Sequence, residues 1–155
     1  MEKDIEQALI DKLQHFLLEP GKGFSFVARQ QRITLDGDHF YIDLVFYNRL
    51  TRCYVLIDLK VGKLTHQDIG QMQMYVNYYK RTQMIEGENE PIGILLCAEK
   101  NKAVVKFTLP EGQKQIYIPK YISYLPTEEE LMTEILREKR IVEMELKLLK
   151  PKGQK

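Results

Sequence analysis

Two runs of alternating apolar residues, 40–47 and 53–60, flank a short polar loop and predict two adjacent β-strands. Apolar side chains recur at every second position and share one face of each strand: Phe40, Ile42, Leu44 and Phe46 in the first, and Cys53, Val55, Ile57 and Leu59 in the second. The opposite faces carry Asp43, Asp58 and Lys60. Burying charge among Val, Ile and Leu is costly unless something compensates it. Three such groups in neighbouring strands therefore indicate a functional site.

The length of the connecting loop decides whether the two aspartates meet. A loop of two residues, 50–51, or of four, 49–52, places Asp43 directly across from Asp58, with their Cβ atoms about 5 Å apart. A one-residue slip would separate the carboxylates and would also mismatch both apolar faces. Two carboxylates this close repel, and one would take up a proton. A hard divalent cation such as Mg²⁺ removes the conflict, and Lys60 would project beside it.

The rest of the chain predicts a mixed α/β fold. Residues 3–18 have the apolar spacing of a helix, with Glu6 on the edge of its apolar face. A strand follows over 24–35, and Asp36-Gly37 is a tight-turn signal that leads into the strand of Asp43, so the first three strands form an antiparallel meander. Thr65 and Asp68 form a capping-box-like start for a helix that runs to about residue 82.

The second half adds a parallel strand and a long helix. Residues 92–98 are almost entirely apolar, as in a strand buried on both faces, and the strand–helix–strand passage implies a right-handed crossover. We expect a short helix at 103–108 and a last edge strand at 115–123. Thr127 and Glu130 form a second capping box, which opens a helix to about residue 149. This helix either packs on the domain or pairs with a second copy of the chain.

Composition limits the classes of function. The chain has 155 residues with a formal charge of +1, so a nucleic-acid contact should be a local patch rather than a generally basic surface. The longest apolar run, 92–98, is too short to span a bilayer, and the acidic N-terminus is unlike a signal peptide. Cys53 and Cys97 lack metal-ligand spacing and indicate packed, reduced thiols in a cytoplasmic protein.

Several segments carry a family resemblance. Asp43, followed by Asp58-Leu59-Lys60 at the end of an apolar strand, resembles the PD-(D/E)xK nuclease superfamily. Residues 21–30, 40–49 and 92–101 are similar to the C-terminal nuclease domain of YhcG-type proteins. The resemblance covers about residues 4–125, and Asp58 stands where many relatives have Glu. It implies a restriction-endonuclease-like α-β-β-β-α-β core at 1–125, a mixed sheet flanked by helices, followed by the C-terminal helix and tail at 126–155.

The resemblance also implies a function and a set of catalytic residues. It implies a nuclease dependent on Mg²⁺ or Mn²⁺ that hydrolyses phosphodiester bonds, with DNA as the expected nucleic acid. Asp43 and Asp58 would bind the metal, helped by the Leu59 carbonyl and, directly or through water, by Glu6. Lys60 would act on the attacking water or stabilise the transition state. The alternative is a retired nuclease fold that binds nucleic acid or protein without cleaving it.

The remaining candidates each have a structural alternative. Gln71 and Tyr75, four residues apart on one helix, resemble an extra motif of RecB-like nucleases in which the glutamine supports the site and the tyrosine approaches DNA. A surface glutamine and a core tyrosine would give the same spacing, and Glu6 would equally suit an ordinary helix boundary. Nucleic-acid phosphates would be held by Arg29, Arg32 and Lys63, although the two arginines also suit a solvated strand face.

Overall fold

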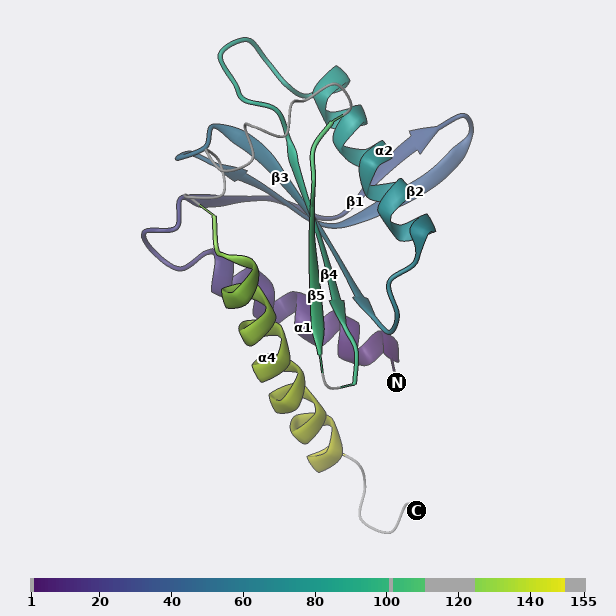
Figure 1. The fold of residues 1–155 in the computed structure, drawn as a ribbon, viewed down its shortest axis with the longest axis vertical. Helices are drawn as coiled ribbons and strands as arrows, with labels where there is room; N and C mark the ends of the chain where they lie inside the picture. The colour runs from purple at the N-terminus through teal and green to yellow at the C-terminus, as the bar shows by residue number, and fades with distance from the viewer. Residues whose placement is uncertain (1, 101, 111–124, 150–155) are drawn as a thin grey trace.

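A central five-stranded sheet organises residues 2–100, 102–110 and 125–149, the part of the chain that the computed structural model describes (Figure 1). The strands lie in the order β1-β2-β3-β4-β5. The elements in chain order are α1 (Glu2–Leu17), β1 (Phe24–Leu35), β2 (Asp38–Asn48), β3 (Cys53–Val61), α2 (His66–Thr82), β4 (Ile92–Ala98), β5 (Ala103–Thr108) and α4 (Glu128–Leu148).

The topology is mixed, as the sequence predicts. Strands β1, β2 and β3 form an antiparallel meander, and β4 then pairs parallel to β3 after the crossover through α2. Thr65 and Asp68 form a complete capping box at the start of α2, as Thr127 and Glu130 do at the start of α4. The α-β-β-β-α-β order is confirmed, and the fold is consistent with the restriction-endonuclease-like class.

The region after β4 differs from the expectation. Residues 103–108 form strand β5 rather than a short helix, and they pair antiparallel with β4 from Ala98↔Ala103 to Gly93↔Thr108. Ala103 and Val105 are buried while Lys106 is exposed, so the period is that of a strand. The expected edge strand at 115–123 lies outside the described residues.

Helices cover both faces of the sheet. Helices α1 and α4 pack on one face, where Leu9, Leu13 and Leu131 join a core with Ile57 and Ile94. Helix α2 packs on the other face, through Met72, Tyr75, Val76 and Tyr79. Strand β3 is buried from both sides, because Val55, Ile57 and Leu59 face α1 while Leu56 faces α2. No helix in the described part of the chain is long and apolar enough to cross a membrane.

Strand β2 changes face at Asp43, which corrects the simple alternation expected for 40–46. Leu44 and Phe46 belong to the α1-side core, whereas Phe40 and Ile42 pack on the α2 side. The β1–β2 register passes from Arg29↔Leu44 to Gln31↔Ile42 and omits the intervening pair, and the β2–β3 ladder stops at Leu44↔Ile57. Across from Asp43, Gln30 has a left-handed backbone with φ of 52°. This break redirects the strand.

The β2–β3 connection fixes the register that leads to the break. Four residues, Arg49–Arg52, join the strands, which is one of the two loop lengths compatible with opposed aspartates. The buried Asn48 side chain holds this loop, because its Oδ1 accepts from the N–H groups of Leu50 and Thr51, both at 3.0 Å. One step beyond the last pair, Leu44↔Ile57, the chain places Asp43 next to Asp58.

Candidate active site

A cavity of about 160 Å³ opens on the α2 side of the sheet, where β2 and β3 separate. Its lining comes from four elements: Asp43, Asp58, Leu59, Lys60, Asp68, Gln71 and Leu95. The structure therefore brings together five of the residues proposed from the sequence, and adds Asp68 and Leu95. Four side chains at this cavity are ionisable, three of them carboxyl groups.

The two aspartates replace the interrupted backbone ladder. The N–H of Asp43 donates to Asp58 Oδ1 over 2.9 Å, and the N–H of Leu59 donates to Asp43 Oδ2 over 2.8 Å. From β1, Gln30 Nε2 donates to Asp43 Oδ1 over 2.9 Å. Each carboxylate thus satisfies backbone donors of the neighbouring strand, which fixes its position without a basic partner. The sequence marks Gln30 only as one of four polar residues at 29–32, which suit a solvated strand face, because glutamine seldom occupies a left-handed position.

Both aspartates are electrostatically unfavourable as anions. Burial raises the pKa of Asp58 well above its ordinary value, and the charge of Asp43 raises it further. Burial also raises the pKa of Asp43, against the hydrogen bonds from Leu59 and Gln30 that lower it. Among the described residues, no lysine or arginine forms an ion pair with Asp58. The uncompensated pair requires a proton or a cation.

Lys60 is directed to a different acid. Its Nζ donates to Asp68 Oδ2 over 2.8 Å, and the same oxygen accepts from the Thr65 N–H at 2.9 Å and from Thr65 Oγ1 at 2.8 Å. Although burial raises the pKa of Asp68, hydrogen bonds from Lys60 and Thr65 bring it below the ordinary value. The sequence marked Asp68 as a helix cap only. The signal that the sequence offered is its position in the first turn of the helix that follows the strand of Lys60. The first turn of that helix must lie near the end of that strand.

Glu6 lies close to the cavity but does not line it. Its Oε1 accepts from the N–H of Val61 over 3.1 Å, at the end of β3. Its charge is also one of the causes that raise the pKa of Asp43, after burial. This helical carboxylate is therefore within electrostatic reach of the aspartate pair.

The two α2 candidates have different environments. Gln71 lines the cavity beside the carboxylates. Tyr75 is buried in the α2-side core and packs edge-on against Phe40, with ring centroids 6.4 Å apart. Burial first, and then the charges of Asp58 and Asp43, raise the pKa of Tyr75. Its position is that of a core tyrosine close behind the site.

The three basic candidates do not converge. Arg29 forms an ion pair with Asp11 and a hydrogen bond with Gln7, so α1 holds it. Arg32 lines a separate cavity of about 150 Å³ together with tyrosines of β3 and α2. Lys63 is exposed just after β3. Of the three, Arg32 and Lys63 remain available on the surface.

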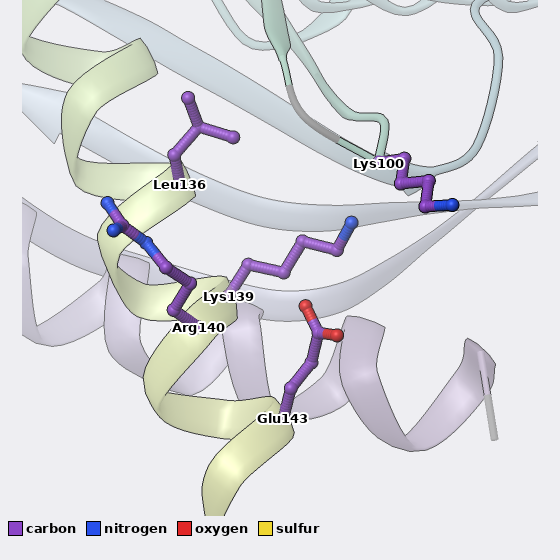
Figure 2. Close-up of a pocket in the computed structure, with 5 residues that line it drawn as sticks. All are labelled: Lys100, Leu136, Lys139, Arg140 and Glu143. Carbon is purple, nitrogen blue, oxygen red and sulfur yellow. The ribbon is translucent and has the colours of Figure 1, made fainter.

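A further basic hollow lies away from the aspartates, between the β4–β5 turn and α4 (Figure 2). It measures about 230 Å³, and its lining residues are Lys100, Leu136, Lys139, Arg140 and Glu143. Figure 2 shows the Arg140 side chain pointing away from the two lysines, and Lys139 Nζ donates to the Glu99 carbonyl over 2.9 Å. With one carboxylate against three basic side chains in its lining, this hollow does not suit a divalent cation.

The charges at the site suit a divalent cation. Three carboxylates and one ammonium, Asp43, Asp58, Asp68 and Lys60, sum to a formal charge of −2 when all are ionised. In the described ranges, no group of three or more His, Cys, Asp or Glu side chains is arranged to hold a metal ion, so any ion here would depend on two carboxylates with water and substrate. Mg²⁺ and Mn²⁺ are commonly held by one or two carboxylates, with water and substrate phosphate completing the shell. The donor set fits such an ion.

Comparison with known proteins identifies a family for this chain. The family described as "YhcG PDDEXK nuclease domain" matches residues 1–137. The Escherichia coli (strain K12) protein named "Putative nuclease YhcG" is 42% identical over 142 residues, which are 92% of this chain and 38% of that protein. This chain therefore spans well under half the length of that relative. A crystal structure of SSO0001 aligns with 77% of this chain and 56% of its own, at 15% identity and a TM-score of 0.41.

Proposed function

The chain belongs to the YhcG family of PD-(D/E)xK nuclease domains, and on this premise we propose that it is a divalent-metal-dependent nuclease. It hydrolyses phosphodiester bonds, and DNA is the expected substrate. The observation that carries the proposal is the aspartate pair: the Asp43 N–H donates to Asp58 Oδ1 over 2.9 Å, and both side chains are half-buried with no ion pair to a basic side chain among the described residues. A fold with no use for this pair would gain stability by replacing it.

The acidic, basic and amide residues proposed from the sequence each have a role in this proposal. Asp43 and Asp58 would hold the ion, helped by the Leu59 carbonyl and, directly or through water, by Glu6. Bound there, Mg²⁺ or Mn²⁺ would lower the pKa of an attacking water and neutralise charge on the scissile phosphate. Lys60 Nζ would orient the attacking water, help deprotonate it, or stabilise the developing negative charge. Gln71 supports this arrangement from the wall of the cavity.

Substrate contacts are proposed for exposed basic side chains outside the cavity. Arg32 and Lys63 are the side chains best placed to bind nucleic-acid phosphates, since Arg29 is engaged by α1. Tyr75 contributes from the core rather than by direct contact.

We propose residues 1–125 as the catalytic unit and 126–155 as an addition. In the addition, α4 packs on α1 and β5 and leaves Leu148 and Leu149 exposed for self-association. The free, buried Cys53 and Cys97 suit the cytoplasm.

The decisive test is a cleavage panel. Labelled single-stranded, duplex and branched DNA and matching RNA forms are incubated with Mg²⁺ or Mn²⁺, with Asp58→Asn as the control. The asparagine amide oxygen can still accept from the Asp43 N–H, so the strand pair keeps its hydrogen bond while the charge is lost. We expect the wild type to cleave at least one form and the variant to cleave none. A wild type that binds nucleic acid but cleaves no form would favour the non-catalytic binding module.

A further inference from the structure

We propose that Asp68 is a positioning residue that holds Lys60 at the wall of the cavity and away from the metal position, an inference that rests on the proposed nuclease function. The residue belongs to α2, so the start of this helix would be part of the catalytic arrangement. Nothing in the D-x-K pattern itself assigns this role to Asp68.

The contact geometry supports the proposal. Asp68 Oδ2 accepts three hydrogen bonds, one from Lys60 Nζ and two from Thr65, all between 2.8 and 2.9 Å. The Thr65 contacts fix the carboxylate at the helix start, and the fixed carboxylate in turn fixes the ammonium group. A lysine has a long, flexible stem with considerable rotamer freedom, and its side chain here is 35% exposed. An anchored acceptor is therefore what defines where this ammonium lies.

The alternative positions of Lys60 show why the anchor matters. Asp43 and Asp58 line the same cavity, and either would attract the ammonium group. A lysine paired with them would occupy the place of the cation and would compete with it. With Nζ bound to Asp68, Lys60 stays at the cavity while the two aspartates keep their remaining lone pairs for a cation.

Helix α4 provides an internal comparison. Thr127 and Glu130 form the same capping box as Thr65 and Asp68, with Glu130 N–H donating to Thr127 Oγ1 over 3.0 Å. No ion pair to Glu130 is present among the described residues. A capping box in this fold therefore forms without a lysine partner, and the Lys60–Asp68 contact is additional to helix capping.

The test separates charge from capping. Asp68→Asn keeps an oxygen that accepts from the Thr65 N–H but loses the charge that holds Lys60, whereas Asp68→Glu keeps the charge and is a favoured capping-box residue. Glu130→Gln makes the matched acid-to-amide change in α4. For each variant, the single-turnover cleavage rate with Mg²⁺ is compared with nucleic-acid affinity in Ca²⁺ and with the melting temperature.

We expect Asp68→Asn to cleave about 10- to 100-fold more slowly, as outer-shell changes commonly do, with affinity within about twofold of wild type. Asp68→Glu should recover much of the rate, and Glu130→Gln should cleave like wild type. The inference is overturned if Asp68→Asn cleaves like wild type, if affinity falls as much as rate, or if Glu130→Gln loses the same rate. If Asp68→Asn does not fold, the comparison is made with Asp68→Glu. A folded Asp68→Glu that cleaves as slowly as Lys60→Ala overturns the inference. A wild type without cleavage removes the proposed function itself.

Discussion

The N–H of Val61, at the end of strand β3, donates to Oε1 of Glu6 on helix α1 over 3.1 Å, although the residues are 55 positions apart. This contact connects the first helix to the strand that carries Asp58 and Lys60. Glu6 thus combines a structural contact with a charge close to Asp43.

Glu6→Gln should separate these two contributions. The amide oxygen still accepts from the Val61 N–H, so the free energy of unfolding should change little, while Mg²⁺ should raise the melting temperature less than in wild type. Glu6→Ala loses the hydrogen bond as well and should lower the free energy of unfolding by about 0.5–1.5 kcal/mol. Urea unfolding and Mg²⁺ titrations measure the two effects. An unchanged Mg²⁺ response in Glu6→Gln would remove Glu6 from the metal site.

Divalent metal should stabilise the protein through Asp43. Without metal, the two aspartates repel, so a bound ion raises stability by linkage and Mg²⁺ raises the melting temperature. Asp43→Asn should abolish this response. Asp36→Asn, which removes a carboxylate from the exposed β1–β2 turn, is the matched control and should respond like wild type. Equal responses in wild type and Asp43→Asn would mean that the ion binds elsewhere.

Stability without metal should depend on pH through Asp58. Burial and the charge of Asp43 raise its pKa in the folded protein above the ordinary 3.8, so the folded state binds the proton more tightly than the unfolded state. This contribution is full below the ordinary pKa and is lost as pH rises toward the folded value. In EDTA, the wild type should therefore lose stability between about pH 5 and pH 8 relative to Asp58→Asn. Chemical unfolding at both pH values measures the difference, and parallel profiles would contradict it.

Lys60 should contribute to the chemical step more than to binding. Lys60→Ala should lower the single-turnover cleavage rate by about 10²–10⁴-fold, the range of general acid–base catalysis, while affinity in Ca²⁺ falls only modestly. Lys100→Ala removes the same charge from the hollow in Figure 2 and should leave the cleavage rate unchanged. If Lys60→Ala cleaves like wild type, the activity belongs to another site or another protein.

Substitution by alanine should change the free energy of unfolding in opposite directions at two glycines. A Cβ at Gly93 on β4 would lie 2.6 Å from Met72 Sδ and 2.9 Å from Val76 Cγ1, so Gly93→Ala should overpack the α2 interface and cost about 1–3 kcal/mol. A Cβ at Gly70 on α2 meets nothing within 4 Å. Gly70→Ala should therefore stabilise the helix by about 0.5–1 kcal/mol. Thermal unfolding distinguishes the two, and a stabilised Gly93→Ala would contradict the close packing of α2 on the sheet.

The opposition of Asp43 and Asp58 was predictable because strand parity is a strong constraint. Only a loop with an even number of residues suits the apolar faces of β2 and β3, and such a loop puts both aspartates on one face. Loops centred between residues 50 and 51 then place them across from each other. The break at Asp43 was not predictable from the same pattern. It depends on Gln30, which adopts a left-handed backbone that the sequence usually signals with glycine or asparagine.

Residues 103–108 show a different limit. Six residues with four apolar positions fit a short helix or a short strand equally well, and period alone cannot decide between them. The unpaired edge of β4 decides the outcome, because its backbone groups need partners and β5 supplies them. The role proposed for Asp68 was hidden for a related reason, since only the folded chain brings the first turn of α2 to Lys60.

The end of the β2–β3 ladder at Leu44↔Ile57 has a consequence for local stability. Beyond it, the first residues of β2 pair with β1 alone, from Gln31↔Ile42 to Leu35↔Asp38. An isolated two-stranded ribbon is only marginally stable in water. This ribbon is supported by Ile33 and Ile42, which pack on α2. Its backbone amides should therefore exchange with solvent hydrogen through openings of lower free energy than those of β3, and loosening α2 should accelerate exchange in the ribbon first.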